Sequence, residues 1–458
     1  MRGALLAPPT ALSPRTPVWK TLAAAALFAS AFLMPAQAAN NEIVGAALKA
    51  MVAEAPLKTG SALADANRDK IRAYYASRSF KPVWSRDAGP KGKARALARE
   101  LQTSLSHALQ PSFYGFDEIV RLMASKKPED LARLDFLLSG ALVDYAHDLV
   151  NGRATTSGAI VENRVNPILL DPAKLIEQAA DSGNLPQMIA GLVGKDRRYL
   201  RLIAKMVEFK RLERNGFWPS GDITASPKAM RTALSITGDL PINQATKAGP
   251  MDAPLRAALK SYQARNGLAA DGKLGPATAK ALETPLSDRI TKLKVNIERR
   301  RWQNREAAGN LLYLNLADTA LKLVRDDKTV GEIAVVRDDA LFRDLPTFYG
   351  QVTAITRSTG GNLALSFEAE NTNLALPPKA KLVLGGNAVQ NLSLLKPFMT
   401  EADGAKATAA TLNEKIVLAK PVPLFLTYLT AWATRDGTLQ LRPDRYSRDG
   451  ALKAKLGL

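Results

Sequence analysis

The chain has 458 residues, which exceeds one ordinary domain and suggests about three. Apolar residues make up 46% and charged residues 23%, a globular composition with enough apolar material for more than one core. The absence of cysteine excludes disulfides, thiolate metal ligands and cysteine nucleophiles, and the two histidines, His107 and His147, exclude a histidine-rich metal site. We therefore expect neither a metal nor a cofactor.

The formal net charge is +20. Residues 1–38 carry three basic and no acidic side chains, so the remainder keeps a charge of +17. A basic protein concentrates near polyanions, and nucleic acid, anionic lipid and acidic cell-wall polymer all qualify. The charge alone does not choose among them.

Residues 1–38 have the pattern of a signal peptide. Lys20 and two upstream arginines precede an apolar run at residues 21–34, and Ala36-Gln37-Ala38 matches a cleavage site. An uncleaved anchor is the alternative, but a spanning helix needs roughly 20 residues and this run is shorter. We expect cleavage after Ala38, a periplasmic location, and no membrane span in the mature chain.

Residues 39–225 are predicted to form an all-α domain. Leucines recur at four-residue steps over residues 97–109, and residues 131–149 and 199–207 each carry one apolar stripe. A single stripe per helix must pack on another helix. In this setting His107 and His147 are expected to pack or to lie on a helix surface.

Residues 226–285 are predicted to form a small domain of three helices, at residues 230–236, 254–266 and 278–282, with turns at Asp271-Gly272 and Gly275-Pro276. A linker helix follows within residues 286–309. It carries a basic cluster of Arg299, Arg300, Arg301 and Arg305. This cluster is either a solvated helix face or a contact for acidic wall material or a partner.

Residues 310–458 change to a period of two and are predicted to be mainly β. Leu312, Leu314 and Leu316 alternate with other side chains, and a hairpin turn at residues 326–328 leads into a strand at residues 330–336. Further strands are predicted at residues 351–356, 363–367, 381–384, 416–418, 423–431 and 438–441. The fold class is therefore α+β and multidomain.

One short motif carries a first family resemblance. It consists of residues 255–259, Tyr262 to Leu268 (Tyr-Gln-Ala-Arg-Asn-Gly-Leu), Asp271-Gly272, Leu274-Gly275, Thr278 and Leu282. In these residues the segment 226–284 resembles a peptidoglycan-binding domain of the three-helix type. The resemblance implies binding of cell-wall glycan or stem peptide, with candidate contacts at Tyr262, Gln263, Arg265, Asp271 and Thr278. A plain three-helix domain without a ligand is the alternative, because Gly267 and Asp271-Gly272 also have simple capping and turn roles.

The flanking regions carry a second resemblance. The residues concerned are Tyr74-Tyr75 to Trp84, 145–153, 199–219, 296–302, 421–423, 428–432, Asp436-Gly437 and Asp444-Arg445-Tyr446. In these residues, and in their order, the chain resembles the large L,D-transpeptidases of the Gram-negative periplasm. The resemblance implies a helical scaffold domain, a peptidoglycan-binding domain and a catalytic β domain.

The β region departs from that family at its active site. The family attacks an acyl group with a cysteine thiolate activated by histidine, and backbone N–H groups stabilise the oxyanion. No histidine follows position 147. The family's active-site motif ends in His-Gly-Cys, and the nearest counterpart of its Gly-Cys pair is Gly385-Gly386-Asn387, which would put Asn387 at the nucleophile's position. A hydroxyl from Ser358, Thr359 or Ser366 would need a base such as Lys379 or Lys381. We assign no catalytic residue.

These patterns predict a catalytically inactive L,D-transpeptidase-like protein that binds peptidoglycan or a cell-wall synthesis partner. One alternative is a divergent wall-modifying enzyme with a nucleophile other than cysteine. Another is a binder of nucleic acid or lipopolysaccharide driven by charge. The predicted export argues against nucleic acid, and the chain has no nucleic-acid motif or patterned aromatic platform.

Overall fold

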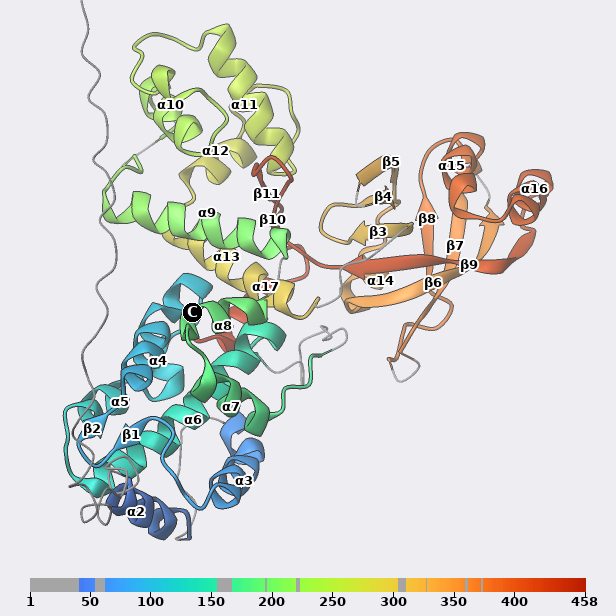
Figure 1. The fold of residues 1–458 in the computed structure, drawn as a ribbon. Coiled ribbons are helices and arrows are strands. Elements are labelled where there is room, and N and C mark those ends of the chain that lie inside the picture. Colours follow the sequence, from blue (N-terminus) through green and yellow to red (C-terminus); the bar gives the residue numbers. More distant parts are fainter. Residues whose placement is uncertain are drawn as a thin grey trace, which may run out of the picture.

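The computed structural model describes residues 41–53, 62–154, 167–193, 196–219, 223–303, 310–326, 328–358, 361–371 and 374–458, without the side chains of residues 62–66. It shows helices in the first half of the chain and a curled sheet in the second, which confirms the α+β multidomain class (Figure 1). The predicted signal peptide, Thr359 and Arg305 lie outside the described residues.

The N-terminal region is built around one long helix, α6. Its helices are α2 (Glu42–Ala53), α3 (Ala62–Ser77), α4 (Gly92–Thr103), α5 (Phe116–Met123), α6 (Pro128–Asn151), α7 (Pro172–Asp181) and α8 (Leu185–Val193). Contacts with α2, α3, α4, α5, α7 and α8 bury α6 on nearly all sides, so polar residues such as Asp135 and Ser139 are buried together with its apolar stripe. A small ribbon of β1 (Ser85–Arg86) and β2 (Gly89–Pro90) is the exception to the all-α prediction. It is held to α6 by Asp135, which accepts the Trp84 N–H at 2.8 Å.

Two helices connect this region to the rest of the protein. They are α9 (Arg197–Arg214) and α13 (Leu286–Arg301), which pack on one another (Figure 1). They run antiparallel, because Arg300 near the end of α13 donates from Nε to Asp196, the N-cap of α9, at 2.9 Å. A small helical module is inserted between them, with α10 (Pro227–Ile236), α11 (Ala253–Arg265) and α12 (Pro276–Glu283). The segment predicted as a linker helix is thus a buried support for this module.

The β region forms one mixed seven-stranded sheet. In spatial order its strands are β5 (Lys328–Ala334), β4 (Ala320–Arg325), β3 (Leu311–Asn315), β9 (Lys415–Thr427), β6 (Phe348–Arg357), β7 (Leu363–Ala369) and β8 (Lys381–Leu384). Only β3 and β9 pair in parallel among the strand pairs that the model describes. The sheet curls until its edges meet at a bridge between Val335 and Leu384, where Gly385 donates its N–H to the Ala334 carbonyl at 2.8 Å. The two edges are therefore joined at residues 334–336 and 383–385.

The predicted strands at residues 416–418 and 423–431 are one strand, β9, up to Thr427. The gap between the two predictions is an irregularity in the pairing with β6, where Val352 lies opposite Val422 but Ala354 lies opposite Val417. An irregularity of this kind accommodates Pro421, because an unpaired strand position needs no N–H donor. Short helices α14 (Asp339–Asp344), α15 (Ala388–Leu395) and α16 (Glu401–Ala409) complete the region.

Residues 428–458 leave the sheet and return to the helices. A hairpin of β10 (Ala431–Ala433) and β11 (Leu439–Leu441) joins the apolar core shared by α9 and α13. Helix α17 (Arg448–Lys455) then packs Leu452 beside Val295 and Trp302. Residues 428–458 therefore pack against the helix pair α9 and α13 as much as against the sheet.

The prediction for the arginine cluster on α13 is wrong for its three described members, which are neither solvated nor presented to a partner. Arg299, Arg300 and Arg301 are 1%, 5% and 3% exposed. They pair with Asp449 at 2.5 Å, Asp196 at 2.9 Å and Glu298 at 3.0 Å, respectively. The reason is that α13 is enclosed by α9, the N-terminal helices and α17, and buried cations of this kind need acidic partners.

None of the described helices combines the length and the apolar composition needed to cross a membrane.

Candidate functional site

The inserted module has its own small core and a well-defined turn after α11. Met230, Leu234, Leu255, Leu259 and Tyr262 are buried together from α10 and α11. Asp252 caps α11 by accepting the Leu255 N–H at 3.0 Å. Gly267, which ends the α11 turn, has φ +68°, a conformation that a residue with a Cβ rarely adopts.

Three of the predicted binding residues form one hydrogen-bonded group. The Gln263 amide nitrogen lies 3.0 Å from Asp271 Oδ1 and 3.1 Å from Thr278 Oγ1, and its oxygen accepts the Gly272 N–H at 2.8 Å. Gln263 and Thr278 are buried, whereas Asp271 is exposed. The Lys273 N–H and the Gln263 amide lower the pKa of Asp271. The group therefore fixes the loop between α11 and α12, and Asp271 is its member at the surface.

Tyr262 and Arg265 face inward. Tyr262 is fully buried and donates its hydroxyl to the Ala281 carbonyl at 2.7 Å. Arg265 is 5% exposed, pairs with Asp239 and donates from Nη1 to the Leu439 carbonyl in β11 at 3.0 Å. Arg265 thus docks the module onto the C-terminal hairpin. Binding of peptidoglycan by the five residues stays a prediction, and only Asp271 among them is placed for direct contact with a ligand.

In the β region, Asn387 has a clear structural role. Its side-chain oxygen accepts the N–H groups of Val389 at 2.8 Å and Gln390 at 3.3 Å, so it is the N-cap of α15. Asparagine is among the preferred residues at this position. The residue that the resemblance would put at the nucleophile's position thus holds a helix terminus.

Two of the residues considered for a hydroxyl mechanism lie opposite one another. Ser366 in β7 pairs with Lys381 in β8, and directly opposed side chains share a face of the sheet. No hydrogen bond links this hydroxyl and amine in the described part of the sheet, and Lys381 is exposed. Ser358 lies in the turn after β6, where its N–H donates to the Asn362 carbonyl at 2.8 Å. Lys379 is exposed in the turn before β8.

The two histidines belong to the N-terminal helical region and not to the sheet. His107 Nδ1 lies 2.9 Å from the Tyr199 hydroxyl, and its carbonyl accepts from Arg301. Burial and the nearby Arg301 charge lower the pKa of His107 to about 4, so it is neutral near pH 7. His147 on α6 lies 3.5 Å from Asp148. For His107 these contacts confirm the predicted packing role.

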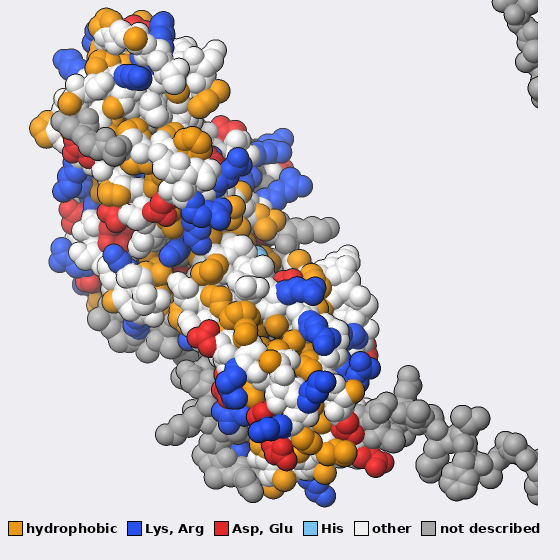
Figure 2. Space-filling model, turned by 90° about the vertical axis from the view of Figure 1, so that its left-hand side faces the viewer, with side chains coloured by type: hydrophobic (Ala, Val, Ile, Leu, Met, Phe, Trp, Pro, Cys, Tyr) orange, Lys and Arg blue, Asp and Glu red, His pale blue; other side chains and the backbone are white. Residues whose placement is uncertain are grey.

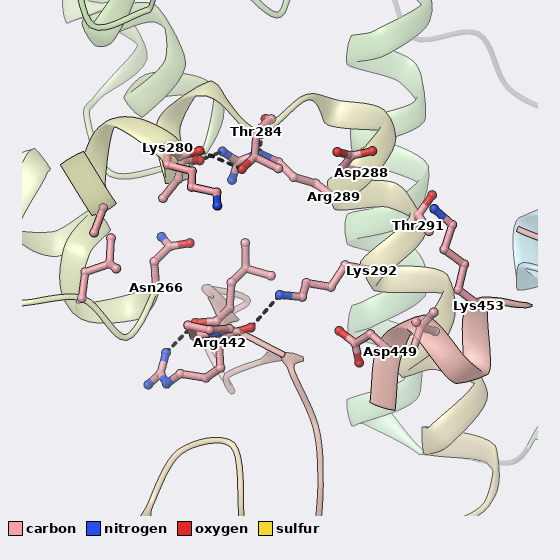
Figure 3. Close-up of a pocket in the computed structure, with 17 residues that line it drawn as sticks. Asn266, Lys280, Thr284, Asp288, Arg289, Thr291, Lys292, Arg442, Asp449 and Lys453 are labelled. Atoms are coloured by element: carbon pink, nitrogen blue, oxygen red, sulfur yellow. Dashed lines mark hydrogen bonds between the residues drawn. The ribbon is translucent and has the colours of Figure 1, made fainter. Parts of the chain in front are cut away.

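A pocket of about 460 Å³ lies where the module, α13 and the C-terminal tail meet (Figure 3). Asn266 and Lys280 border it from the module, Lys292 from α13, and Arg442 from the tail. The amino groups of Lys280 and Lys292 point into this space in Figure 3, and Lys292 donates to the Arg442 carbonyl at 2.6 Å. Sequence reasoning missed the pocket because its walls come from residues 266–295 and 441–453, which are far apart in the sequence.

Basic side chains are also spread over the outer surface. On the face shown in Figure 2, Lys and Arg extend from the module at the top to the N-terminal helices at the bottom. Helix α9 alone carries seven Lys or Arg residues and two Glu residues. The positive charge of the chain is therefore distributed and is not confined to the pocket.

Comparison with known families assigns the first two regions. Residues 69–206 match a scaffold domain, and residues 210–282 match a peptidoglycan binding domain. The chain carries a peptidoglycan-binding domain. The second match covers the end of α9 and the inserted module up to α12, so it includes most of the predicted segment 226–285. The order of the two domains is consistent with an L,D-transpeptidase-like architecture, although neither match reaches the sheet. No curated protein matches the chain.

Proposed function

We propose that this chain is an exported periplasmic protein that binds peptidoglycan and does not cross-link it. The match of residues 210–282 to a peptidoglycan binding domain carries the proposal. In the proposal, the sheet is a degenerate L,D-transpeptidase domain, and the protein anchors itself or a cell-wall synthesis partner to the wall.

The chemistry of the sheet supports the non-catalytic part of the proposal. The 458 residues contain no thiol, and no histidine follows position 147. A positioned general base alone contributes about 10²–10⁴-fold in rate. At the position that aligns with the nucleophile, Asn387 caps α15 and offers no nucleophilic atom.

Co-sedimentation of the mature chain with purified peptidoglycan sacculi tests binding. Attraction between exposed charges is screened over about 8 Å at physiological ionic strength and over shorter distances as salt rises. We therefore expect a salt-sensitive part, from the distributed positive charge, and a salt-resistant part, from the module. Replacement of residues 220–285 by a short flexible linker between α9 and α13 should remove the salt-resistant part. If all binding disappears in moderate salt and the replacement changes nothing, the module does not bind the wall.

The alternative of a hydroxyl nucleophile has one supporting observation, the opposition of Ser366 and Lys381. Intact-mass measurement after incubation with a carbapenem distinguishes the two proposals. We expect no adduct, and the Ser366→Ala variant should behave as the parent chain. A stable adduct that maps to Ser366, and that this variant lacks, would establish the enzyme alternative.

A further inference from the structure

The pocket between the module, α13 and the C-terminal tail, called the junction pocket below, exists because the module is docked on the tail. Arg442 in the tail donates from Nη1 to the Arg265 carbonyl at 2.7 Å, and Arg265 donates in return to Leu439. Gly267 approaches the tail so closely that a Cβ there would lie 2.7 Å from Arg442 Cδ. The walls are therefore held in place by direct contacts between the module and the tail. The volume of about 460 Å³ is within the usual range for small-ligand sites.

The charges that line the pocket are mainly positive. Lys280, Arg289, Lys292, Arg442 and Lys453 line it, against Asp288 and Asp449. Several of these groups already have partners: Arg442 pairs with Asp318 at 2.6 Å, Arg289 donates to the Ala281 carbonyl at 2.6 Å, and Asp449 pairs with Arg299. In the described part of the chain, Lys280 and Lys292 have no carboxylate partner, so their charges are available to a ligand.

Lys292 is held in a position that favours an anion. Among the described residues, Lys292 Nζ has one hydrogen-bond partner, the Arg442 carbonyl, which leaves further ammonium hydrogens to donate. Burial is the main cause that lowers the pKa of Lys292, with the charges of Arg299 and Arg289 acting in the same direction and those of Asp449 and Asp444 against it. A bound carboxylate would restore the stability of its charged form.

Six apolar residues also line the pocket, beside the polar Asn266, Thr284 and Thr291, and this apolar surface selects among anions. Leu268, Ala277, Ala281, Val295, Leu441 and Pro443 contribute it. A strongly hydrated phosphate or a bare sugar gains little from such a surface, whereas a short peptide with methyl side chains and a carboxylate gains from both parts. The peptide stems of peptidoglycan consist of alanine and carboxylate-bearing residues.

We propose that the junction pocket binds a carboxylate-bearing segment of a peptidoglycan peptide stem, with Lys280 and Lys292 as the anion contacts. This inference rests on the proposed function and assigns the stem peptide, not the glycan, to this site. It also gives the docked arrangement of the module a role, since the site is incomplete on the module alone.

The test is calorimetric titration of the full mature chain with a soluble disaccharide–tetrapeptide. Lys280→Glu reverses one exposed charge at the pocket, and Lys292→Gln removes the other charge while keeping a donor for the Arg442 carbonyl. Lys228→Glu is the matched control, because Lys228 is an exposed lysine on α10 outside the pocket. We expect each pocket variant to lower the affinity by about tenfold or more, equivalent to about 1.4 kcal/mol. The control should change it less than about twofold, or by about 0.4 kcal/mol.

Three further probes identify the recognised group. The disaccharide without peptide, the tetrapeptide conjugate with its carboxylates amidated, and inorganic phosphate should each bind more weakly than the parent conjugate. Equal binding of the amidated conjugate, or tighter binding of phosphate, would overturn the carboxylate assignment. If the pocket variants match the control while salt-resistant binding to sacculi persists, the pocket proposal fails and the proposed function stands. Loss of salt-resistant binding in the parent chain would instead reject the proposed function.

Discussion

Arg442 Nη1 lies 2.7 Å from the carbonyl oxygen of Arg265, across 177 residues of sequence. This bond connects the residue that follows β11 to the end of α11, and Asp318 in the turn between β3 and β4 holds the same guanidinium at 2.6 Å. One side chain thus contacts the module, the tail and the sheet. The three regions meet at this point, and the pocket lies beside it.

Gly267 tests how closely the module must approach the tail. Gly267→Ala would place a Cβ 2.7 Å from Arg442 Cδ, at a residue with φ +68°. We expect a loss of about 1–2 kcal/mol in the free energy of unfolding, from backbone strain and from displacement of Arg442. Urea denaturation measures it. Gly275→Ala is the control, because its φ is −89° and no atom lies within 4 Å of the added Cβ. Equal effects of the two substitutions would show that the close approach does not matter.

Glu298 tests the buried charges of α13. Its carboxylate accepts from Arg301 at 3.0 Å and from the Ala154 N–H at 2.7 Å, with both charged side chains 1% exposed. Glu298→Gln leaves the Arg301 charge buried without its anion and should cost about 3 kcal/mol of stability. Glu208→Gln breaks a partly exposed pair with Lys205 and should cost less than about 1 kcal/mol. Thermal unfolding of both variants would contradict this ranking if their melting temperatures fell equally.

The lowered pKa of His107 predicts that the stability of the fold depends on pH. Its pKa is about 4 in the folded chain, against an ordinary value near 6.5. Between these values the unfolded chain binds the proton and the folded chain does not, so stability falls as the pH drops from about 6.5 to 4 and is unaffected above that range. His107→Asn keeps a polar partner for Tyr199 and should reduce this fall by up to about 3 kcal/mol. Melting curves with the same pH dependence in both chains would exclude the effect.

The sequence predicted elements well where periodicity was long and local. The apolar stripe over residues 131–149 corresponds to α6, and the alternation from Leu312 to Leu316 corresponds to β3. Helices α14, α15 and α16 were missed because six to nine residues are too few for a helical stripe to stand out. In α15 a signal was present, since an asparagine N-cap precedes it, but the comparison with a catalytic motif drew attention away from that role.

The site was harder to predict than the elements. The arginines of α13 suggested an exposed basic face because their partners, Asp196 and Asp449, lie 104 and 150 residues away. The pocket likewise depends on tertiary contacts, since Lys280, Lys292 and Arg442 come from different segments. The motif that contains Gln263 and Asp271 was recognisable from its spacing. The same spacing is also needed for the hydrogen bonds that fix the loop between α11 and α12.

The most direct test of binding without cross-linking is the muropeptide composition of purified sacculi after incubation with the mature chain. The measurement is made at a salt concentration where the chain co-sediments with the sacculi, and the digest is compared with a control without protein. We predict that the two digests are identical, and that Asn387→Cys leaves them so, because the thiol would still lack a histidine base. New cross-linked muropeptides in the digest from the parent chain would contradict the proposal and show that the sheet holds a working nucleophile.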